Sequence, residues 1–214
     1  MKLSKVMSAW AVAAALGLGV MNAQAAIVVN LIPGAGTSGV IGDATFTFGQ
    51  AQPAGSGVFD SFVRIQGAGK DVVEGYNTTV NNVFDNTSDN TFNHAITVGQ
   101  VGFLDQDEFG QGGKMRFFLD INQVAAQNPP PPQSYLSLSE VQVFISTTPN
   151  QSVTTFTGGV VNLANSALVY QMAPGSNGNR VDLDYIHNSG SGQADMTMDI
   201  ARSAFDSAFA ALGL

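Results

Sequence analysis

Acidic side chains are the groups in this sequence best able to carry chemistry, because the chain has no cysteine and only two histidines, His94 and His187. The lack of cysteine excludes thiol nucleophiles and thiolate metal sites. Neither histidine lies in an H-E-x-x-H motif, and no G-x-S-x-G elbow occurs. A Ser-His-Asp triad assembles in space and therefore stays open, but we expect both histidines to be ordinary surface residues.

A glycosidase would need two carboxylates roughly 5–10 Å apart, one of them in an apolar pocket. Six acidic residues on expected strands could supply such a pair, and their spacing singles out no two of them. We therefore predict no catalytic residue and a non-enzymatic protein. The six are Asp120, Glu140, Asp182, Asp184, Asp195 and Asp199.

Calcium binding is a stronger expectation for the acidic residues, because calcium takes about six to eight oxygen ligands from carboxylates, amides and carbonyls. The segment from Asp105 to Gly110 partly matches an EF-hand loop. Phe109 and Arg116 occupy the fifth and twelfth places of that loop, where oxygen ligands belong. The pattern therefore predicts an irregular calcium site with the ligands Asp105, Asp107 and Glu108.

A second group of acidic residues lies on the last two expected strands, which we interpret as one hairpin with a turn at 187–193. If these strands pair in register, Asp182 and Asp184 share a face with Asp195 and Asp199. Like charges opposed across a ladder are destabilising unless water or a cation separates them. A solvated acidic face is the favoured interpretation, and calcium at Asp182, Asp184 and Asp195 is the alternative.

The elements that position these residues are predicted to be short strands, since apolar and polar residues alternate in most segments. The clearest are Met115–Ile121 and Glu140–Ser146. Residues 128–132 between them should form a polyproline II spacer, the alternative being a ligand for a proline-recognising module. Other strands are expected at Ala26–Ile32, Thr45–Phe48, Val58–Gln66, Ala95–Phe103 and Ala167–Met172.

A G-x-G-x-x-G pattern at Gly34–Gly39 follows the first expected strand. In a dinucleotide site these glycines open a helix that cradles a pyrophosphate. Here the next residues alternate as a strand does, so we predict a turn between strands and no bound dinucleotide.

Only the C-terminus is predicted to be helical, over about residues 203–212. Ser203 is the expected N-cap, Phe205, Phe209 and Leu212 recur at helical spacing, and Gly213 is a stop signal.

About ten short strands and one terminal helix predict an all-β protein. We expect an antiparallel β-sandwich with a jelly-roll-like topology and one short C-terminal helix.

The N-terminal 25 residues have the features of a secretory signal peptide. Lys2 and Lys5 precede the apolar run Trp10–Val20, and Ala23-Gln24-Ala25 is an A-x-A cleavage site. We expect cleavage before Ala26, which leaves a single domain over residues 26–214 and no transmembrane segment. The mature chain then has six basic residues (8 − 2) and sixteen acidic ones. This acidic surplus argues against nucleic-acid binding.

Several phrases resemble a group of exported bacterial PEP-CTERM sorting-domain proteins of unknown biochemical function. The resemblance rests on GSGVFDSFVRIQ (55–66), EGYNT (74–78), FFLDINQ (117–123), LSLSEVQVFIS (136–146), LVYQM (168–172) and LDYIHNSGSGQADM (183–196). It implies an extracellular or cell-surface protein, often of exopolysaccharide-producing bacteria, and brings no catalytic residue. The Pro-Glu-Pro motif, apolar helix and basic cluster that usually end such proteins are not present in this chain.

These features lead us to expect a secreted or cell-surface structural or interaction protein of an extracellular matrix, surface layer or filament. Its expected partners are extracellular polysaccharide or further copies of itself, as a homo-oligomer. A carbohydrate-binding module is the alternative, with Tyr76 and Tyr135 as candidate sugar contacts, although rim packing is favoured for both. Trp10, the only tryptophan, would be removed with the signal peptide. A secreted glycoside hydrolase ranks third.

Overall fold

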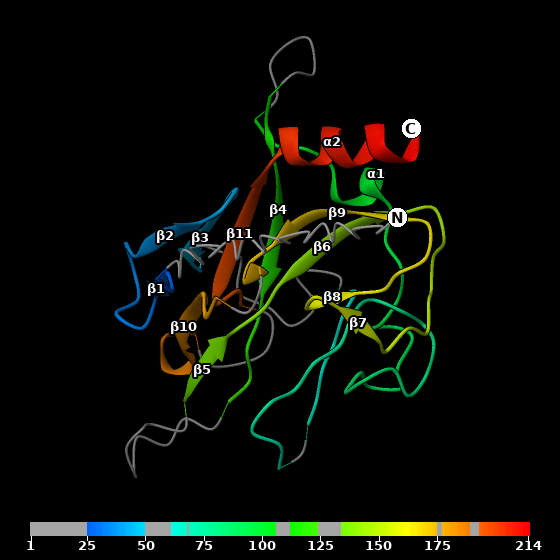
Figure 1. Ribbon diagram of the computed structural model, residues 1–214. Helices are drawn as coiled ribbons and strands as arrows, with labels where there is room; N and C mark the ends of the chain where they lie inside the picture. The colour runs from blue at the N-terminus through cyan, green and yellow to red at the C-terminus, as the bar shows by residue number, and fades with distance from the viewer. Residues whose placement is uncertain are drawn as a thin grey trace, which may run out of the picture.

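The protein is described by a computed structural model that covers residues 25–49, 61–67, 69–105, 112–123, 134–174, 177–188 and 193–214. Most regular structure in these residues is β, in two main sheets and two smaller two-stranded ones (Figure 1). Residues 1–24 and the proline segment 128–132 lie outside the described residues. None of the described helices is long and apolar enough to cross a membrane.

The larger sheet has four antiparallel strands in the order β2-β3-β11-β4. These are β2 (Ser38–Ile41), β3 (Ala44–Phe48), β11 (Met196–Ala201) and β4 (Lys114–Leu119). β11 lies between β3 and β4, although it is separated from both by long stretches of sequence.

The second sheet has three strands in the order β1-β10-β5, which are β1 (Val28–Asn30), β10 (Arg180–Asp184) and β5 (Tyr135–Leu138). β1 runs parallel to β10, whereas β5 is antiparallel to it. The smaller sheets pair β6 (Gln142–Ser146) with β9 (Ser166–Gln171), and β7 (Phe156–Thr157) with β8 (Val160–Val161).

One core joins the two main sheets in a sandwich-like arrangement. Phe46 and Ile200 from the larger sheet, and Val181 and Leu183 from the smaller one, are almost wholly buried in the same cluster. The C-terminal helix α2 (Arg202–Leu212) lies against β9 and β6 and adds Phe205 to that core (Figure 1). The predicted all-β fold with one C-terminal helix is therefore confirmed.

The ends of α2 confirm one predicted signal and correct another. Gly213 ends the helix in the left-handed conformation, with φ of 71°, as the sequence predicts. The predicted N-cap Ser203 is wrong, because Ala201 occupies the N-cap and no side chain caps the helix there. β11 runs directly into α2, so the preceding strand fixes the start of the helix.

The predicted strand Ala95–Phe103 is wrong, because a short helix, α1 (Val98–Val101), forms there. Thr97 and Gln100 form a capping box at its start. Around the predicted strand Val58–Gln66, residues 61–67 contain only an isolated bridge between Ile65 and Asn86. The Gly34–Gly39 pattern forms the turn between β1 and β2, as predicted, and its last two residues begin β2.

The predicted hairpin of β10 and β11 is also wrong, since the two strands belong to different sheets. A 3₁₀ helix at Tyr185–Asn188 follows β10 directly. In the sequence, this 3₁₀ helix separates β10 of the smaller sheet from β11 of the larger sheet. Asp182 and Asp184 therefore do not share a sheet face with Asp195 and Asp199.

Candidate functional site

An open pocket of about 360 Å³ lies on the larger sheet, where β3, β11 and β4 adjoin. Four of its side chains are charged and one carries a hydroxyl. The pocket is lined by Asp43, Thr45, Asp105, Gly113, Lys114, Asp199 and Ala201. Of these residues, only Asp105 belongs to the calcium ligands predicted from the sequence.

The register of the sheet places Asp199 at the centre of this site. On β11, Asp199 is paired with Thr45 of β3 on one side and with Arg116 of β4 on the other. Directly opposed residues project to the same face of a sheet, so these three side chains are neighbours. Met198 and Ile200, which alternate with Asp199, are buried in the core.

One turn and one backbone bridge complete the rim of the pocket. Gly42, with φ of 57°, allows the tight connection of β2 to β3 that presents Asp43. Ala201 N donates to Asp43 O at 3.5 Å, which holds this turn near the end of β11. On the other side, backbone hydrogen bonds of 2.8 and 3.0 Å between Leu104 and Lys114 place Asp105 beside β4.

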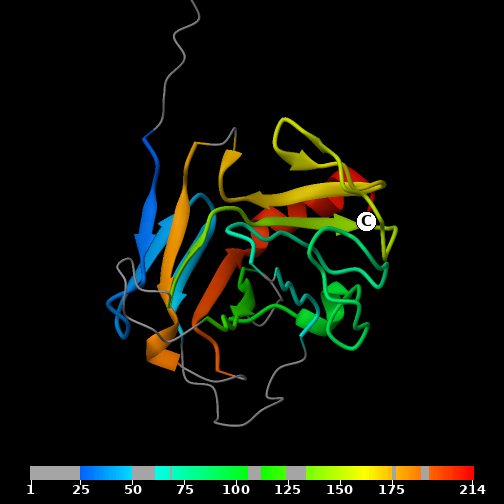
Figure 2. The same ribbon diagram turned by 90° about the horizontal axis from the view of Figure 1, so that it is seen from below.

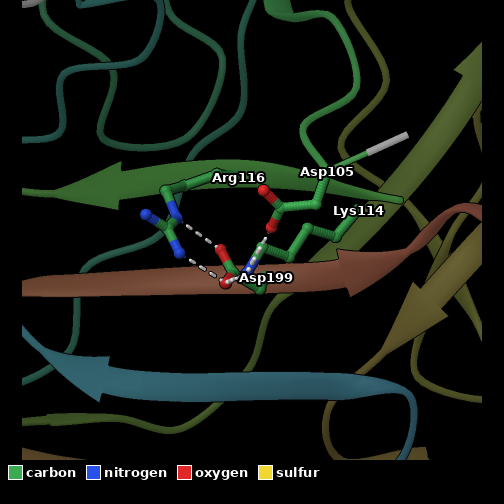
Figure 3. Close-up of polar contacts among 4 residues, drawn as sticks. All are labelled: Asp105, Lys114, Arg116 and Asp199. Carbon is green, nitrogen blue, oxygen red and sulfur yellow. Dashed lines mark hydrogen bonds and ion pairs between the residues drawn. The ribbon is translucent and has the colours of Figure 1, made fainter. Parts of the chain in front are cut away.

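Figure 3 shows that the charged groups bind one another. Arg116 contacts Asp199 with both donors, Nε to Oδ1 at 2.6 Å and Nη2 to Oδ2 at 2.7 Å. The Lys114 ammonium lies 3.0 Å from Asp199 Oδ2 and 3.2 Å from Asp105 Oδ2. Bidentate Arg–carboxylate contacts of this kind are strong and geometrically fixed.

The ion pairs keep these groups charged. Burial acts to raise the pKa of Asp199, but hydrogen bonds from Arg116 and Lys114 outweigh it and hold that pKa below its usual range. The hydrogen bonds to Asp199 and Asp105 raise the pKa of Lys114. Asp199 therefore stays a carboxylate at neutral pH and Lys114 stays an ammonium, which suits neither of them to proton transfer.

The other predicted calcium ligands have separate places and partners. Asp182 Oδ1 accepts from Ser137 Oγ at 2.7 Å and from Arg180 Nε at 3.1 Å. Asp184 Oδ1 accepts from Ile186 N at 3.2 Å at the start of the 3₁₀ helix. Among the residues that the structure describes, no three acidic or histidine side chains form a group that could hold a metal ion.

Asp107 and Glu108 lie outside the described residues, so calcium binding near Asp105 stays a prediction.

Asp195 is a buried carboxylate at the start of β11, with only 1% of its surface exposed. Its Oδ2 accepts from Ile121 N at 2.8 Å, and within the described part of the chain Oδ1 has no hydrogen-bond partner. Burial raises the pKa of Asp195 to about 7, and the nearby charge of Asp120 adds to the shift. Such a pKa would suit a general acid, although the side chain lies inside the fold and outside the residues that line the pocket.

His187 and Tyr76, two of the residues singled out in the sequence, have structural contacts. His187 Nε2 lies 2.7 Å from Ile32 O and supports the turn after β1. The Tyr76 hydroxyl lies 2.9 and 3.0 Å from the carbonyl oxygens of Gln151 and Val153. Tyr135, on β5, remains 40% exposed and is the better placed of the two tyrosines for a ligand.

The pocket residues Asp43, Thr45 and Lys114 were not predicted as site residues, and neither was Arg116, which binds Asp199. Alternation along β4 indicates that Lys114 and Arg116 share a face opposite Met115. Their pairing with Asp199 depends on a register between strands that are about eighty residues apart in the chain. A single sequence carries no local signal for that register.

No known protein-family model, curated protein or solved structure matches this chain. The resemblance to exported PEP-CTERM proteins therefore stays a prediction.

Proposed function

We propose that this chain is an exported, non-enzymatic structural or interaction protein of an extracellular matrix, which contacts hydroxyl-rich polymer through the charged pocket. The observation that carries the proposal is the arrangement around Asp199. Its charges are fixed by mutual ion pairs in an open pocket. This arrangement suits recognition of a polar surface better than proton transfer.

The chemistry of the pocket favours hydroxyl groups as its ligand. Carboxylate oxygens of Asp43 and Asp105 can accept hydrogen bonds, the Thr45 hydroxyl can donate or accept, and the Lys114 ammonium can donate. Sugar hydroxyls can both donate and accept hydrogen bonds, so one polysaccharide segment could bind all four of these side chains. The acidic surplus of the whole chain favours a neutral or cationic polymer over a strongly anionic one.

Binding measurements on residues 26–214 test this proposal. The exported protein is titrated with neutral, amino-substituted and acidic polysaccharides, as wild type and as Asp199→Asn. We expect measurable binding to a neutral or amino-substituted polymer and a loss of about tenfold or more in the variant, which corresponds to about 1.4 kcal/mol.

Asp182→Asn is the matched control, because Asp182 is a partly buried strand aspartate of the other sheet, outside the pocket. It should bind as wild type does. A protein that stayed strictly monomeric and bound none of the polymers would overturn the proposal.

A carbohydrate-binding module that recognises one defined glycan is the second candidate. Tyr135 supports it, since an exposed aromatic ring on β5 offers a stacking surface for a sugar. A glycan array separates the two proposals. Selective binding of one glycan that is lost in Tyr135→Ala but kept in Asp199→Asn would favour this candidate.

A further inference from the structure

β1 is a short strand at the edge of the smaller sheet, at the left of Figure 2. It pairs with β10 in parallel, with Val28, Val29 and Asn30 opposite Arg180, Val181 and Asp182. Among the described strand pairs it is the one parallel pair. An edge strand that is not part of a hairpin with its partner can leave the sheet without breaking any other strand pair.

Val29 of β1 and Leu31, the residue that follows the strand, pack into the core beside β10 and β2. Val29 is 4% exposed, Leu31 is fully buried, and both belong to the main core. Gly39 of β2 makes room for this contact, because a Cβ atom at that position would lie 2.7 Å from Val29 Cγ2. Removing β1 would therefore open an apolar groove shaped for two alternate side chains of one strand.

Backbone hydrogen bonds hold both ends of β1. Leu31 N donates to Asp182 O at 2.9 Å, and Arg180 N donates to Ile27 O at 3.1 Å. Ile27 N also donates to Asn179 Oδ1 at 2.8 Å. The groove thus offers main-chain partners for a strand, which give affinity, and two apolar pockets, which give specificity.

The connection from β1 to β2 is a glycine turn. Gly34 and Gly36 both have φ of 86°, and the turn is closed by Gly34 N to Leu31 O at 3.0 Å and Thr37 Oγ1 to Gly34 O at 2.6 Å. Glycine adopts extended conformations as easily as this one. The turn is therefore suited to open into a linker that carries β1 away from its own groove.

We propose that β1 of one copy inserts into the groove of a second copy of this chain, so that copies join by exchange of β1. The second copy is the favoured occupant because its N-terminal segment has the same Val29 in β1, and the same Leu31 directly after it, that fit the groove. Every contact of the closed monomer is regained in the exchanged form, so protein concentration decides between them. The predicted removal of residues 1–25 would leave β1 next to a free chain end.

This inference rests on the proposed function, because exchange of β1 would supply the self-association expected of a matrix protein. Donor strand and groove lie at different places on each copy once the turn opens. Exchange can therefore close a dimer or continue into a chain of copies.

Disulfide trapping tests the exchange without background, because the chain has no cysteine. Val28→Cys and Arg180→Cys are made in separate proteins, one with a mass tag, and the two are mixed at high concentration and oxidised. Val28 and Arg180 are register partners, a spacing that suits a disulfide. We expect a cross-linked heterodimer that reducing agent dissolves.

Leu168→Cys replaces Arg180→Cys in the matched control, because Leu168 is an exposed residue of β9 in another sheet. Cross-linking to this position should be at least tenfold weaker. Equal cross-linking to both positions would mean random collision of surface thiols and would overturn the proposal.

The double variant Val28→Cys/Arg180→Cys, oxidised at low concentration, locks β1 in its own groove. We expect the locked protein to stay monomeric at concentrations where the reduced form assembles. Assembly of the locked protein to the same extent as the reduced form would refute exchange of β1 and leave the proposed function standing. If the wild type neither assembles nor binds any polymer, both proposals fall.

Discussion

Arg116 of β4 and Asp199 of β11 form a two-point ion pair, at 2.6 and 2.7 Å, and Asp199 lines the charged pocket. The Asp199 side chain is only 13% exposed, so its charge depends on Arg116 and Lys114 for compensation. A partly buried carboxylate left without its main partner pays most of its desolvation cost. The Arg116–Asp199 contact therefore stabilises the sheet and also compensates the charge of Asp199 in the pocket.

Replacing Arg116 by methionine should destabilise the fold by about 1–3 kcal/mol, because Asp199 loses two charge-assisted hydrogen bonds. Urea unfolding followed by circular dichroism measures the change. Asp206→Asn is the control, since the Arg202–Asp206 pair on α2 is long, at 3.4 Å, and Asp206 is 55% exposed. The control should change stability by less than about 0.5 kcal/mol.

Low pH should weaken the Asp199 contact. Its pKa is lowered in the folded protein, so its contribution is present above the unfolded value of about 3.9 and is lost as pH falls through the folded value. Wild type and Asp199→Asn should therefore differ in stability at pH 6, and this difference should shrink as pH falls from about 3.9 through the lower folded pKa. A difference that stays constant from pH 6 down to about pH 2, measured by urea unfolding, would contradict the assignment.

Asp195 should give the opposite dependence. Its pKa is raised to about 7 in the folded protein, chiefly by burial, so the folded state holds the proton more tightly than the unfolded state. The resulting stability is fully present below about pH 3.9 and is lost as pH rises through about 7. Asp195→Asn should remove a fall of roughly 1–4 kcal/mol between pH 4 and pH 8. An unchanged pH profile in this variant would refute the prediction.

Gly39 should be intolerant of a side chain, because a Cβ atom there would lie 2.7 Å from Val29. Gly39→Ala should cost about 1–3 kcal/mol through overpacking between β1 and β2. Gly99→Ala is the matched control, since no atom lies within 4 Å of the added Cβ in α1, and it should be neutral or slightly stabilising. Equal melting temperatures of the two variants would contradict the close packing of β1.

Calcium should raise the melting temperature through the Asp105–Glu108 segment and not through β10 and β11. The predicted grouping of Asp182, Asp184 and Asp195 does not form, because β10 and β11 belong to different sheets. Asp182→Asn should keep the calcium shift, whereas Asp107→Asn should lose it. A wild-type thermal scan that is the same in chelator and in millimolar calcium would end this expectation.

Local signals in the sequence are enough for some strands and for the C-terminal helix, but not for the segments Val58–Gln66 and Ala95–Phe103. Alternation around Met115 predicted β4, and the spacing of Phe205, Phe209 and Leu212 predicted α2. α1 is not predicted from the sequence, because Val98 and Val101 resemble part of a strand, although Thr97 and Gln100 form a capping-box pattern.

The partners of each strand could not be predicted in the same way. The short connection after Tyr185 is typical of a hairpin, yet the 3₁₀ helix at Tyr185–Asn188 follows β10, and β11 belongs to the other sheet. The Arg116–Asp199 pair depends on the register of β4 with β11, which is set by packing of the whole core. The sequence indicates which acidic residues lie on strands, but it does not indicate which residues contact them in the fold.

The most direct test of the central claim follows polymer binding and polymer length in the same sample. Residues 26–214 are incubated with a polysaccharide that they bind, sedimented with it, and the chain length of the polymer is then measured. The proposed function predicts co-sedimentation that falls about tenfold in Asp199→Asn, with the chain length unchanged over time. Shortening of the polymer that disappears in Asp195→Asn or Asp120→Asn would contradict it and identify a hydrolase.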